Sequence, residues 1–277
     1  MQKKQRVKTL VVYLELAALA MLLVFPVFWM LSISLRENLE VFSVPPKLWP
    51  GTVTIEPYIK VLVTNRYLRY FMNSYVISLA VSVISCVLGI IAGYGFSRFA
   101  FKGSKLCSMI IVATQTIPRV TLLIPYFVLL VTFKLFNTYT GLILTFTSFC
   151  LPYAVLMMTG YINTISKEID EAVIMDGGTR FMALWRILVP VSLPGIVSTL
   201  TYTFILAWNE FLFALTLTRD DAMRTVPVGI AMLKGEQAYE WNMIMAFSIL
   251  GSLPVLVIFL ILQKYYVSGL TAGSVKG

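Results

Sequence analysis

Polar side chains in two of the apolar segments have the types that bind polyhydroxylated ligands such as sugars. Arg119 lies in the middle of one segment with Gln115 close by, and another segment contains the run Trp208, Asn209 and Glu210. In a membrane such polar groups cost roughly 2.5–3.5 kcal/mol each unless they face a cavity or a partner. Aromatic faces stack on sugar rings, and amide, carboxylate and guanidinium groups bond to hydroxyls. These residues are therefore candidates for lining a ligand path. The alternative is that Arg119 and Glu210 pair structurally.

A polar stretch over residues 163–195 has the pattern of two short helices joined by glycines. In the first helix Ile169, Ala172 and Val173 share one face, and Ser166 can cap the helix start. Acidic residues near that start suit the positive end of the helix dipole. Two adjacent glycines then permit a left-handed exit. The residues that mark the stretch are Glu171, Ala172, Asp176, Gly177, Gly178, Ile187 and Pro190.

The second helix of this stretch is predicted from apolar side chains at i, i+3, i+4 and i+7 spacing. They are Phe181, Leu184, Trp185 and Leu188. Pro190 and Pro194 then break the pattern. Two helices that meet at glycines form a compact surface knob suited to docking. The alternative interpretation is an amphipathic loop lying on a membrane surface.

The composition predicts an integral membrane protein. Of the 277 residues 58% are hydrophobic and only 13% are charged, and the mean hydropathy is +0.84. The chain has no His, and no Cys or carboxylate cluster has ligand spacing, so we expect no metal site and no disulfide among its 3 Cys. It also has no Gly-x-x-x-x-Gly-Lys-Ser/Thr loop, so we expect no ATP binding and no enzymatic activity of its own. The net charge of +9 suits an anionic membrane surface, and nucleic-acid binding need not be invoked.

Six apolar runs are long enough to cross a bilayer, for which about 20 residues suffice. They are Leu10–Ser34, Ser74–Phe96, Leu106–Val131, Gly141–Ile162, Ile196–Thr218 and Met243–Gln263. Such runs must be helices, because lipid offers no partners for free backbone groups. We therefore predict an all-α protein with a single transmembrane domain over residues 1–277 and an uncleaved first helix. The third span is expected to break at Pro118 and again at Pro125.

The orientation is predicted from Lys and Arg. An even number of spans puts both termini on one side, where these residues are more frequent, so the termini and residues 163–195 are expected to be cytoplasmic. The external segment Arg36–Arg69 contains several prolines and is expected to be rich in turns, with a short helix around Tyr58–Thr64. It is either a docking element or an inert connector.

The polar stretch also has the spacing of a known motif. Glu171-Ala172-Val173, three residues, Gly177, nine residues and Ile187-Leu188-Val189-Pro190 resemble the EAA loop of permease subunits in bacterial ATP-binding-cassette (ABC) importers. Val173 and Val189 replace the more usual Ala and Leu by small apolar residues. Further matching segments are Phe71–Ser74, Phe136–Tyr139, Trp208–Phe211 and the tail Gln263–Gly277. Together they resemble the carbohydrate-uptake branch, the maltose-type and oligosaccharide permeases.

The resemblance implies a six-span type I importer permease in the bacterial plasma membrane. Its partners would be a second homologous permease, an ATPase dimer that binds ATP and Mg, an extracellular sugar-binding protein, a sugar substrate and membrane lipid. The EAA loop would dock on the ATPase, with Glu171 in polar contacts, Ala172 permitting close approach and Gly177 setting the elbow. The cytoplasmic tail 264–277, and Gly269–Lys276 in particular, would contact the ATPase.

Two alternatives remain open for the transported solute and the source of energy. A related importer for amino acids, phosphate or glycerol phosphate is one, since Arg119 could serve an anion. A self-sufficient secondary carrier or channel is the other, although we find no inverted repeat in the sequence.

Overall fold

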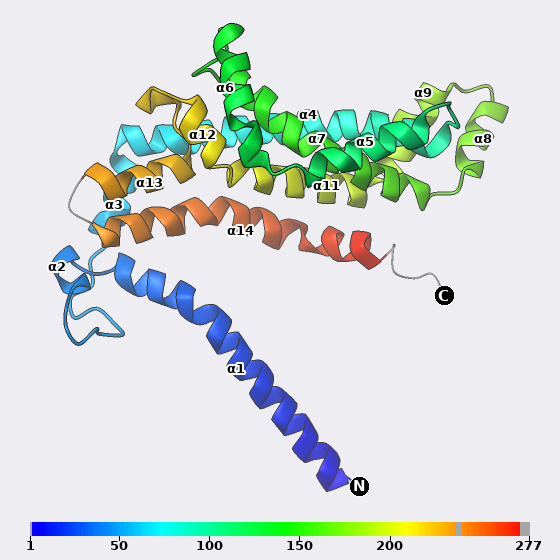
Figure 1. The fold of residues 1–277 in the computed structure, drawn as a ribbon. Coiled ribbons are helices and arrows are strands. Elements are labelled where there is room, and N and C mark those ends of the chain that lie inside the picture. Colours follow the sequence, from blue (N-terminus) through cyan, green and yellow to red (C-terminus); the bar gives the residue numbers. More distant parts are fainter. Residues whose placement is uncertain (1, 237–239, 272–277) are drawn as a thin grey trace. The chain divides into compact units, whose positions relative to one another are not determined.

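The computed structural model describes residues 2–236 and 240–271, and within these residues it contains helices and no strand (Figure 1). The helices are α1 (Gln2–Ser34), α2 (Asn38–Val41), α3 (Glu56–Val63), α4 (Asn65–Arg98), α5 (Ser104–Thr116), η1 (Arg119–Leu122), α6 (Leu123–Thr132), α7 (Tyr139–Asn163), α8 (Glu168–Met175), α9 (Arg180–Met182), η2 (Ala183–Leu188), α10 (Val189–Val191), α11 (Leu193–Trp208), α12 (Leu212–Leu217), η3 (Asp221–Met223), α13 (Val226–Glu236) and α14 (Trp241–Thr271). Here η1 and η3 are 3₁₀-helices, and η2 is a π-helix.

Four helices are long and apolar enough to cross a membrane alone, and two bent pairs bring the number to 6. The four are Thr9–Ser34, Asn65–Arg98, Tyr139–Asn163 and Trp241–Gln263, and the pairs are Ser104–Thr116 with Arg119–Thr132 and Arg180–Val191 with Leu193–Trp208. The pairs bend by 96° and 77°. The predicted all-α class is confirmed, and the number of candidate spans in the described residues agrees with the predicted six when each bent pair is counted as one span. The fifth differs in its bounds, because the bent pair covers residues 180–208 and the prediction was Ile196–Thr218. The third and fifth segments, however, are not straight helices.

Proline explains the first bend and shows where one expectation was wrong. α5 ends just before Ile117 and Pro118, because the residue before a proline disfavours helical geometry. Pro125, in contrast, lies in the first turn of α6 and does not interrupt it. A proline there removes only an N–H group that would have no helical partner. The third segment is thus broken once, at Pro118.

The chain divides into two compact units, residues 1–68 with 230–253, and residues 69–229 with 254–277. In the first unit, Arg36 is buried and organises the loop that follows α1. Its Nη2 donates to Ser32 Oγ at 2.8 Å and also to the carbonyl of Lys47, and its own carbonyl accepts from Asn242 Nδ2 at 2.9 Å. The short helix expected around Tyr58–Thr64 is present as α3.

In the second unit, small residues let α4 approach α7 closely. A Cβ added to Gly89 would lie 2.9 Å from the Ala154 backbone, and one added to Gly93 would lie 2.8 Å from the Thr159 nitrogen. Glycines four residues apart allow such close approach in membrane helices. α11 packs beside α7, where a Cβ on Gly195 would fall 2.5 Å from the ring of Tyr161 (Figure 1). Helices α4, α7 and α11 therefore form a tightly packed framework.

Two of the motif segments bond to the segment after α12. One lies at the start of α4 and the other lies just before α7. Asn73 Nδ2 donates to the carbonyls of Ala222 and Arg224 at 2.9 and 2.7 Å, and Ser74 Oγ accepts from the Val226 N–H at 2.8 Å. Asn137 Oδ1 accepts from the backbone N–H groups of residues 219 and 220 at 2.9 and 3.1 Å. These side chains bond to backbone groups, so their contacts in the structure are architectural.

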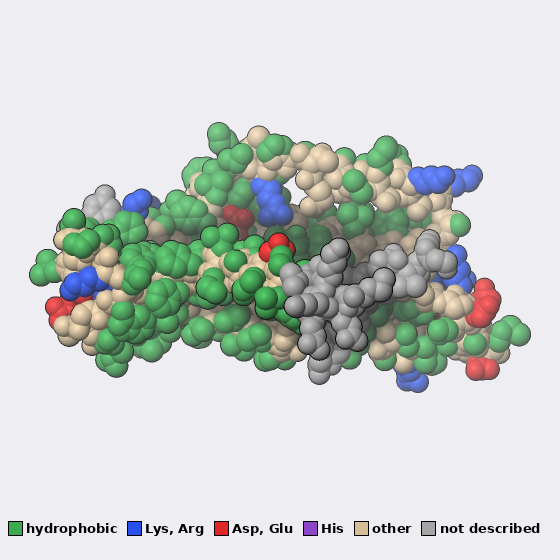
Figure 2. Space-filling model, turned by 90° about the horizontal axis from the view of Figure 1, so that it is seen from below, with side chains coloured by type: hydrophobic (Ala, Val, Ile, Leu, Met, Phe, Trp, Pro, Cys, Tyr) green, Lys and Arg blue, Asp and Glu red, His purple; other side chains and the backbone are tan. Residues whose placement is uncertain are grey.

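The surface is apolar over long stretches. Large hydrophobic side chains are exposed along α1, α4 and α14, including Leu22, Leu79 and Leu260. Figure 2 shows one face on which hydrophobic side chains cover most of the described surface and charged ones are few. Exposed apolar area of this extent fits contact with lipid tails rather than water.

Candidate functional site

The first helix of the 163–195 stretch, α8, ends in a local motif set by its glycines. Gly177 N–H donates to the Ile174 carbonyl at 3.0 Å and Gly178 N–H to the Val173 carbonyl at 2.8 Å, the pattern of a Schellman cap. Gly177 has φ +82°, whereas a Cβ on Gly178 would lie 2.7 Å from Val173 Cγ1. The predicted left-handed exit thus occurs at Gly177, and Gly178 is needed for space.

The start of α8 is also close to expectation. Ser166 Oγ accepts from the Glu168 N–H at 3.3 Å, and Glu168, Asp170 and Glu171 all lie in the first turn. The inward face differs, because Ala172 is exposed and Asp170 is buried. Of the three residues predicted to share one face, Ile169 and Val173 are partly buried and Ala172 is exposed.

Asp170 is buried because Arg98, at the end of α4, pairs with it. Arg98 Nε donates to Asp170 Oδ2, and the two side chains are only 3% and 7% exposed. Arg98 also donates to Ser97 Oγ at 3.1 Å and to the Ile165 carbonyl at 3.0 Å, while Ser97 Oγ donates to Asn163 Oδ1 at 2.6 Å. This network holds α8 to a membrane-spanning helix. The sequence analysis missed it.

The second part of the stretch is one helical segment over residues 180–191, made of α9, η2 and α10. Thr179 caps it by accepting from the Met182 N–H at 3.2 Å. The segment continues through Pro190 and ends at Ser192, so the expected break at Pro190 is displaced by two residues. Pro190 therefore lies near the carboxyl end of this continuous segment, directly after the π-helix η2.

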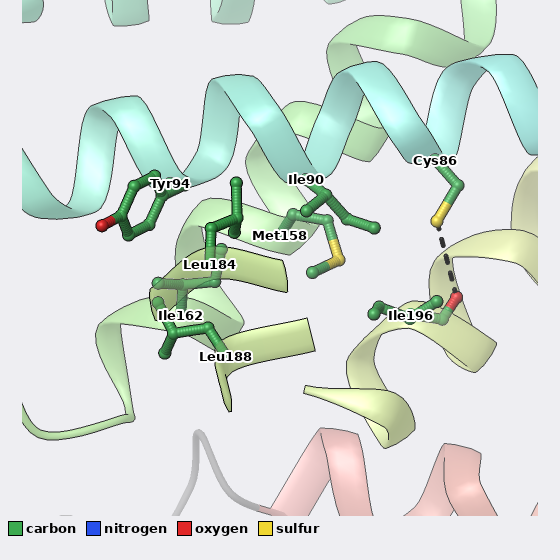
Figure 3. Close-up of a cluster of buried hydrophobic side chains, with 8 residues drawn as sticks. All are labelled: Cys86, Ile90, Tyr94, Met158, Ile162, Leu184, Leu188 and Ile196. Carbon is green, nitrogen blue, oxygen red and sulfur yellow. Dashed lines mark hydrogen bonds between the residues drawn. The ribbon is translucent and has the colours of Figure 1, made fainter. Parts of the chain in front are cut away.

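Leu184 and Leu188 anchor this segment in the protein core. They pack in a buried cluster with Cys86, Ile90 and Tyr94 of α4, Met158 and Ile162 of α7, and Ile196 of α11 (Figure 3). In the same cluster the Cys86 thiol donates to the Ile196 carbonyl at 3.9 Å. A displacement of η2 must therefore also displace side chains of α4, α7 and α11, the three helices of the framework.

The opposite side of the 163–195 stretch is exposed. Glu171, Ala172, Asp176, Gly177, Ile187 and Pro190 are exposed and Gly178 is partly exposed. Two apolar side chains stand out, since Met175 is 86% and Phe181 is 72% exposed. Phe181 has helical spacing to Leu184 and Leu188 but is not part of their buried cluster. Exposed apolar side chains beside carboxylates form a surface suited to a protein partner.

The polar residues of the third segment lie around a cavity of about 220 Å³. Arg119 and Gln115 both line it, and the Arg119 guanidinium lies 5.4 Å from the centre of the Phe149 ring, within cation–π range. Tyr126 and Ser148, whose hydroxyls are 2.5 Å apart, are on the same wall. The broken helix thus places a guanidinium, an amide, hydroxyls and aromatic faces together.

The run Trp208–Glu210 has other surroundings. Trp208 is buried against Tyr75 and Phe204, with ring centres 4.9 and 5.5 Å apart. Asn209 caps the end of α11, and Glu210 Oε1 accepts from the Phe213 N–H at 3.1 Å. In the part of the chain that the structure describes, no ion pair joins Arg119 to Glu210 and no cluster of His, Cys, Asp or Glu could hold a metal ion.

A family model described as the binding-protein-dependent transport system inner membrane component matches residues 85–270. The chain belongs to this family. The match includes both the 163–195 stretch and the cavity at Arg119, and it confirms the resemblance to ABC importer permeases. Sequence relatives and a solved structure also point to ABC transporter permeases.

The chain is 34% identical over 253 residues to the sulfoquinovosyl glycerol transport system permease protein SmoH of Agrobacterium fabrum, covering 91% of this chain and 89% of that protein. It is 33% identical to the trehalose/maltose transport system permease protein MalG of Thermococcus litoralis, over 99% of each. A chain of a bacterial ABC transporter involved in the import of the acidic polysaccharide alginate has the same fold. Its TM-score is 0.83 at 20% identity, over 95% of this chain and 98% of that one.

Proposed function

We propose that this chain is the membrane subunit of an ATP-driven importer that moves a sugar or short oligosaccharide across the bacterial plasma membrane by alternating access. The relatives named for sulfoquinovosyl glycerol, trehalose and maltose support a glycosidic substrate. Both termini and the 163–195 stretch lie on the cytoplasmic side, as the distribution of Lys and Arg favours.

The observation that carries the proposal is the contrast between the two sides of that stretch. Its inner side is fixed in the framework by Leu184, Leu188 and the ion pair of Asp170. Its outer side presents Glu171, Ala172 and exposed apolar side chains to a partner. An ATPase that binds this surface and closes on ATP moves α4, α7 and α11 with it. ATP shifts the permease only because one arrangement binds the closed ATPase better.

The other partners follow from the same proposal. A second permease subunit completes the path, an extracellular binding protein delivers the sugar, and ATP and Mg bind only to the ATPase pair. The tail 264–277 contacts the ATPase. The part of it after residue 271 lies outside the described residues.

Three changes test the docking surface in the assembled transporter. Glu171→Lys reverses a charge, Gly177→Asp places a negative charge on the elbow, and Ala172→Trp adds bulk at an exposed position with no packing role. Each is expected to abolish sugar uptake and co-purification of the ATPase while the permease still inserts. Glu37→Lys is the matched control for ATPase co-purification, since Glu37 is also exposed and lies outside the stretch.

The alternative of a self-powered carrier makes the opposite prediction. Uptake would persist without the ATPase subunit, would not depend on ATP, and would be unchanged by Ala172→Trp. Any of these results would refute the proposed coupling.

For the substrate path we propose that the cavity of Arg119 and Gln115 is a sugar contact. Support comes from its mixture of a cation, an amide and aromatic faces. Arg119→Gln is expected to reduce uptake at unchanged expression, and Arg219→Gln, an exposed arginine elsewhere, is expected not to. We extend the path to Asn209 and Glu210, each tested by alanine. If Arg119→Gln abolishes uptake of glycerol phosphate and spares neutral sugars, the anion importer is the correct alternative.

A further inference from the structure

A second cavity lies between the end of α4 and the start of α5, away from the candidate path. Its volume is about 780 Å³, compared with about 220 Å³ for the cavity at Arg119. It is bordered by the turn 99–103 and by Lys167, the residue just before α8. A space of this size lies in the range of small-molecule pockets.

Its charge has one sign. Lys102, Lys105 and Lys167 line the cavity, and no Asp or Glu does. Within the described residues none of the three lysines forms an ion pair. Arg98 also borders the cavity, but its guanidinium is bound to Asp170 and to the Ile165 carbonyl. Three lysine ammonium groups are therefore available for an anionic ligand.

The same cavity has exposed apolar walls. Phe99, Phe101 and Leu106 line it and are exposed. They lie where one membrane-spanning segment ends and the next begins. Aromatic side chains and lysines occur together at the boundary between lipid headgroups and tails. A free anion such as phosphate would contact only the lysines, whereas an anionic lipid would contact both the lysines and the apolar side chains.

We propose that the α4–α5 turn and Lys167 form a binding site for the phosphate headgroup of an anionic phospholipid. The three lysines contact the phosphate, and its acyl chains lie along Phe99, Phe101 and Leu106. The N-cap of α5, Gly103, offers no side chain to the first N–H groups of that helix, so a phosphate there also suits the helix dipole. Since Lys167 immediately precedes α8, the lipid lies beside the start of this helix.

Lipid retention by the purified transporter complex tests the site without any sugar. Native mass spectrometry compares phosphatidylglycerol with phosphatidylcholine in the wild type and in a triple Lys→Gln variant at positions 102, 105 and 167. Removing one juxtamembrane lysine is expected to weaken anionic-lipid binding roughly fivefold, so the triple variant loses roughly 100-fold. Phosphatidylcholine binding stays unchanged. The matched control is Lys→Gln at Lys60, Lys134 and Lys234, which removes the same charge elsewhere.

Each remaining outcome overturns the proposal. Equal loss in the control triple variant means that only net charge matters. Displacement of phosphatidylglycerol by inorganic phosphate at equal concentration means that the site holds a free anion. Unchanged lipid binding with loss of the ATPase from the triple variant means that the lysines face an acidic protein surface. None of these readouts depends on which solute is transported.

Discussion

The buried pair between Arg98 and Asp170 is expected to decide whether α8 stays attached to the membrane helices. Asp170→Asn removes the negative charge beside the Arg98 side chain, which is 3% exposed, and leaves the guanidinium with neutral acceptors alone: the Asn amide oxygen, Ser97 Oγ and the Ile165 carbonyl. Breaking a buried ion pair by removing one partner costs about 3–5 kcal/mol. At about 1.4 kcal/mol per factor of ten, the open state of α8 becomes roughly 100- to 4,000-fold more populated.

Hydrogen exchange of the α8 backbone amides in the purified complex measures this opening directly. Their protection is expected to fall by that factor in Asp170→Asn. Glu168→Gln is the matched control, because Glu168 lies in the same helical turn, carries the same charge and is exposed. It should change protection by less than about fivefold, since an exposed charge at a helix start is worth less than about 1 kcal/mol.

The double variant Arg98→Met with Asp170→Leu separates the charge from the shape of the contact. Replacing both members of a buried pair by apolar residues of similar size is often close to neutral, so protection should largely return. Sugar uptake should follow protection in all four proteins. If Asp170→Asn and Glu168→Gln lose protection equally, the pair does not hold α8, and the reasoning is refuted.

Four shorter predictions concern glycines and one carboxylate. Gly177→Asn should keep ATPase co-purification and Gly177→Val should lose it, because φ +82° costs a residue other than Gly about 1–2 kcal/mol and Asn tolerates it best. Gly178→Ala should lower the melting temperature of the complex, since its Cβ would lie 2.8 Å from the Val173 carbonyl oxygen. Gly93→Leu should leave little folded permease on size exclusion, because it separates α4 from α7. The Gly51 N–H lowers the pKa of Glu40, so the melting-temperature gap between wild type and Glu40→Gln should be full above the usual carboxyl pKa, shrink below it and be lost as pH falls through the lowered one.

The features that depend only on neighbouring residues could be predicted from the sequence. The cap at Gly177 needs only a glycine after a helix, and the break at Pro118 needs only a proline. The six segments were predictable from hydropathy because a bilayer requires a fixed length of apolar helix. The structure departs from the sequence prediction at Pro190, where the helical segment continues past the proline and ends at Ser192.

Which side chains of the 163–195 stretch are buried could not be predicted from the sequence, for two physical reasons. Residues 183–188 form a π-helix, so the spacing that put Phe181 on one stripe with Leu184 and Leu188 does not apply, and Phe181 turns outward. Asp170 is buried by a partner 72 residues away, on α4. Hydrophobic periodicity assumes that charges face water, so it could not predict that Asp170 lies on the buried side of α8. The buried side chain of Arg98 makes this possible, and a charged residue, Asp170, therefore fixes α8 to α4 while Ala172 stays exposed.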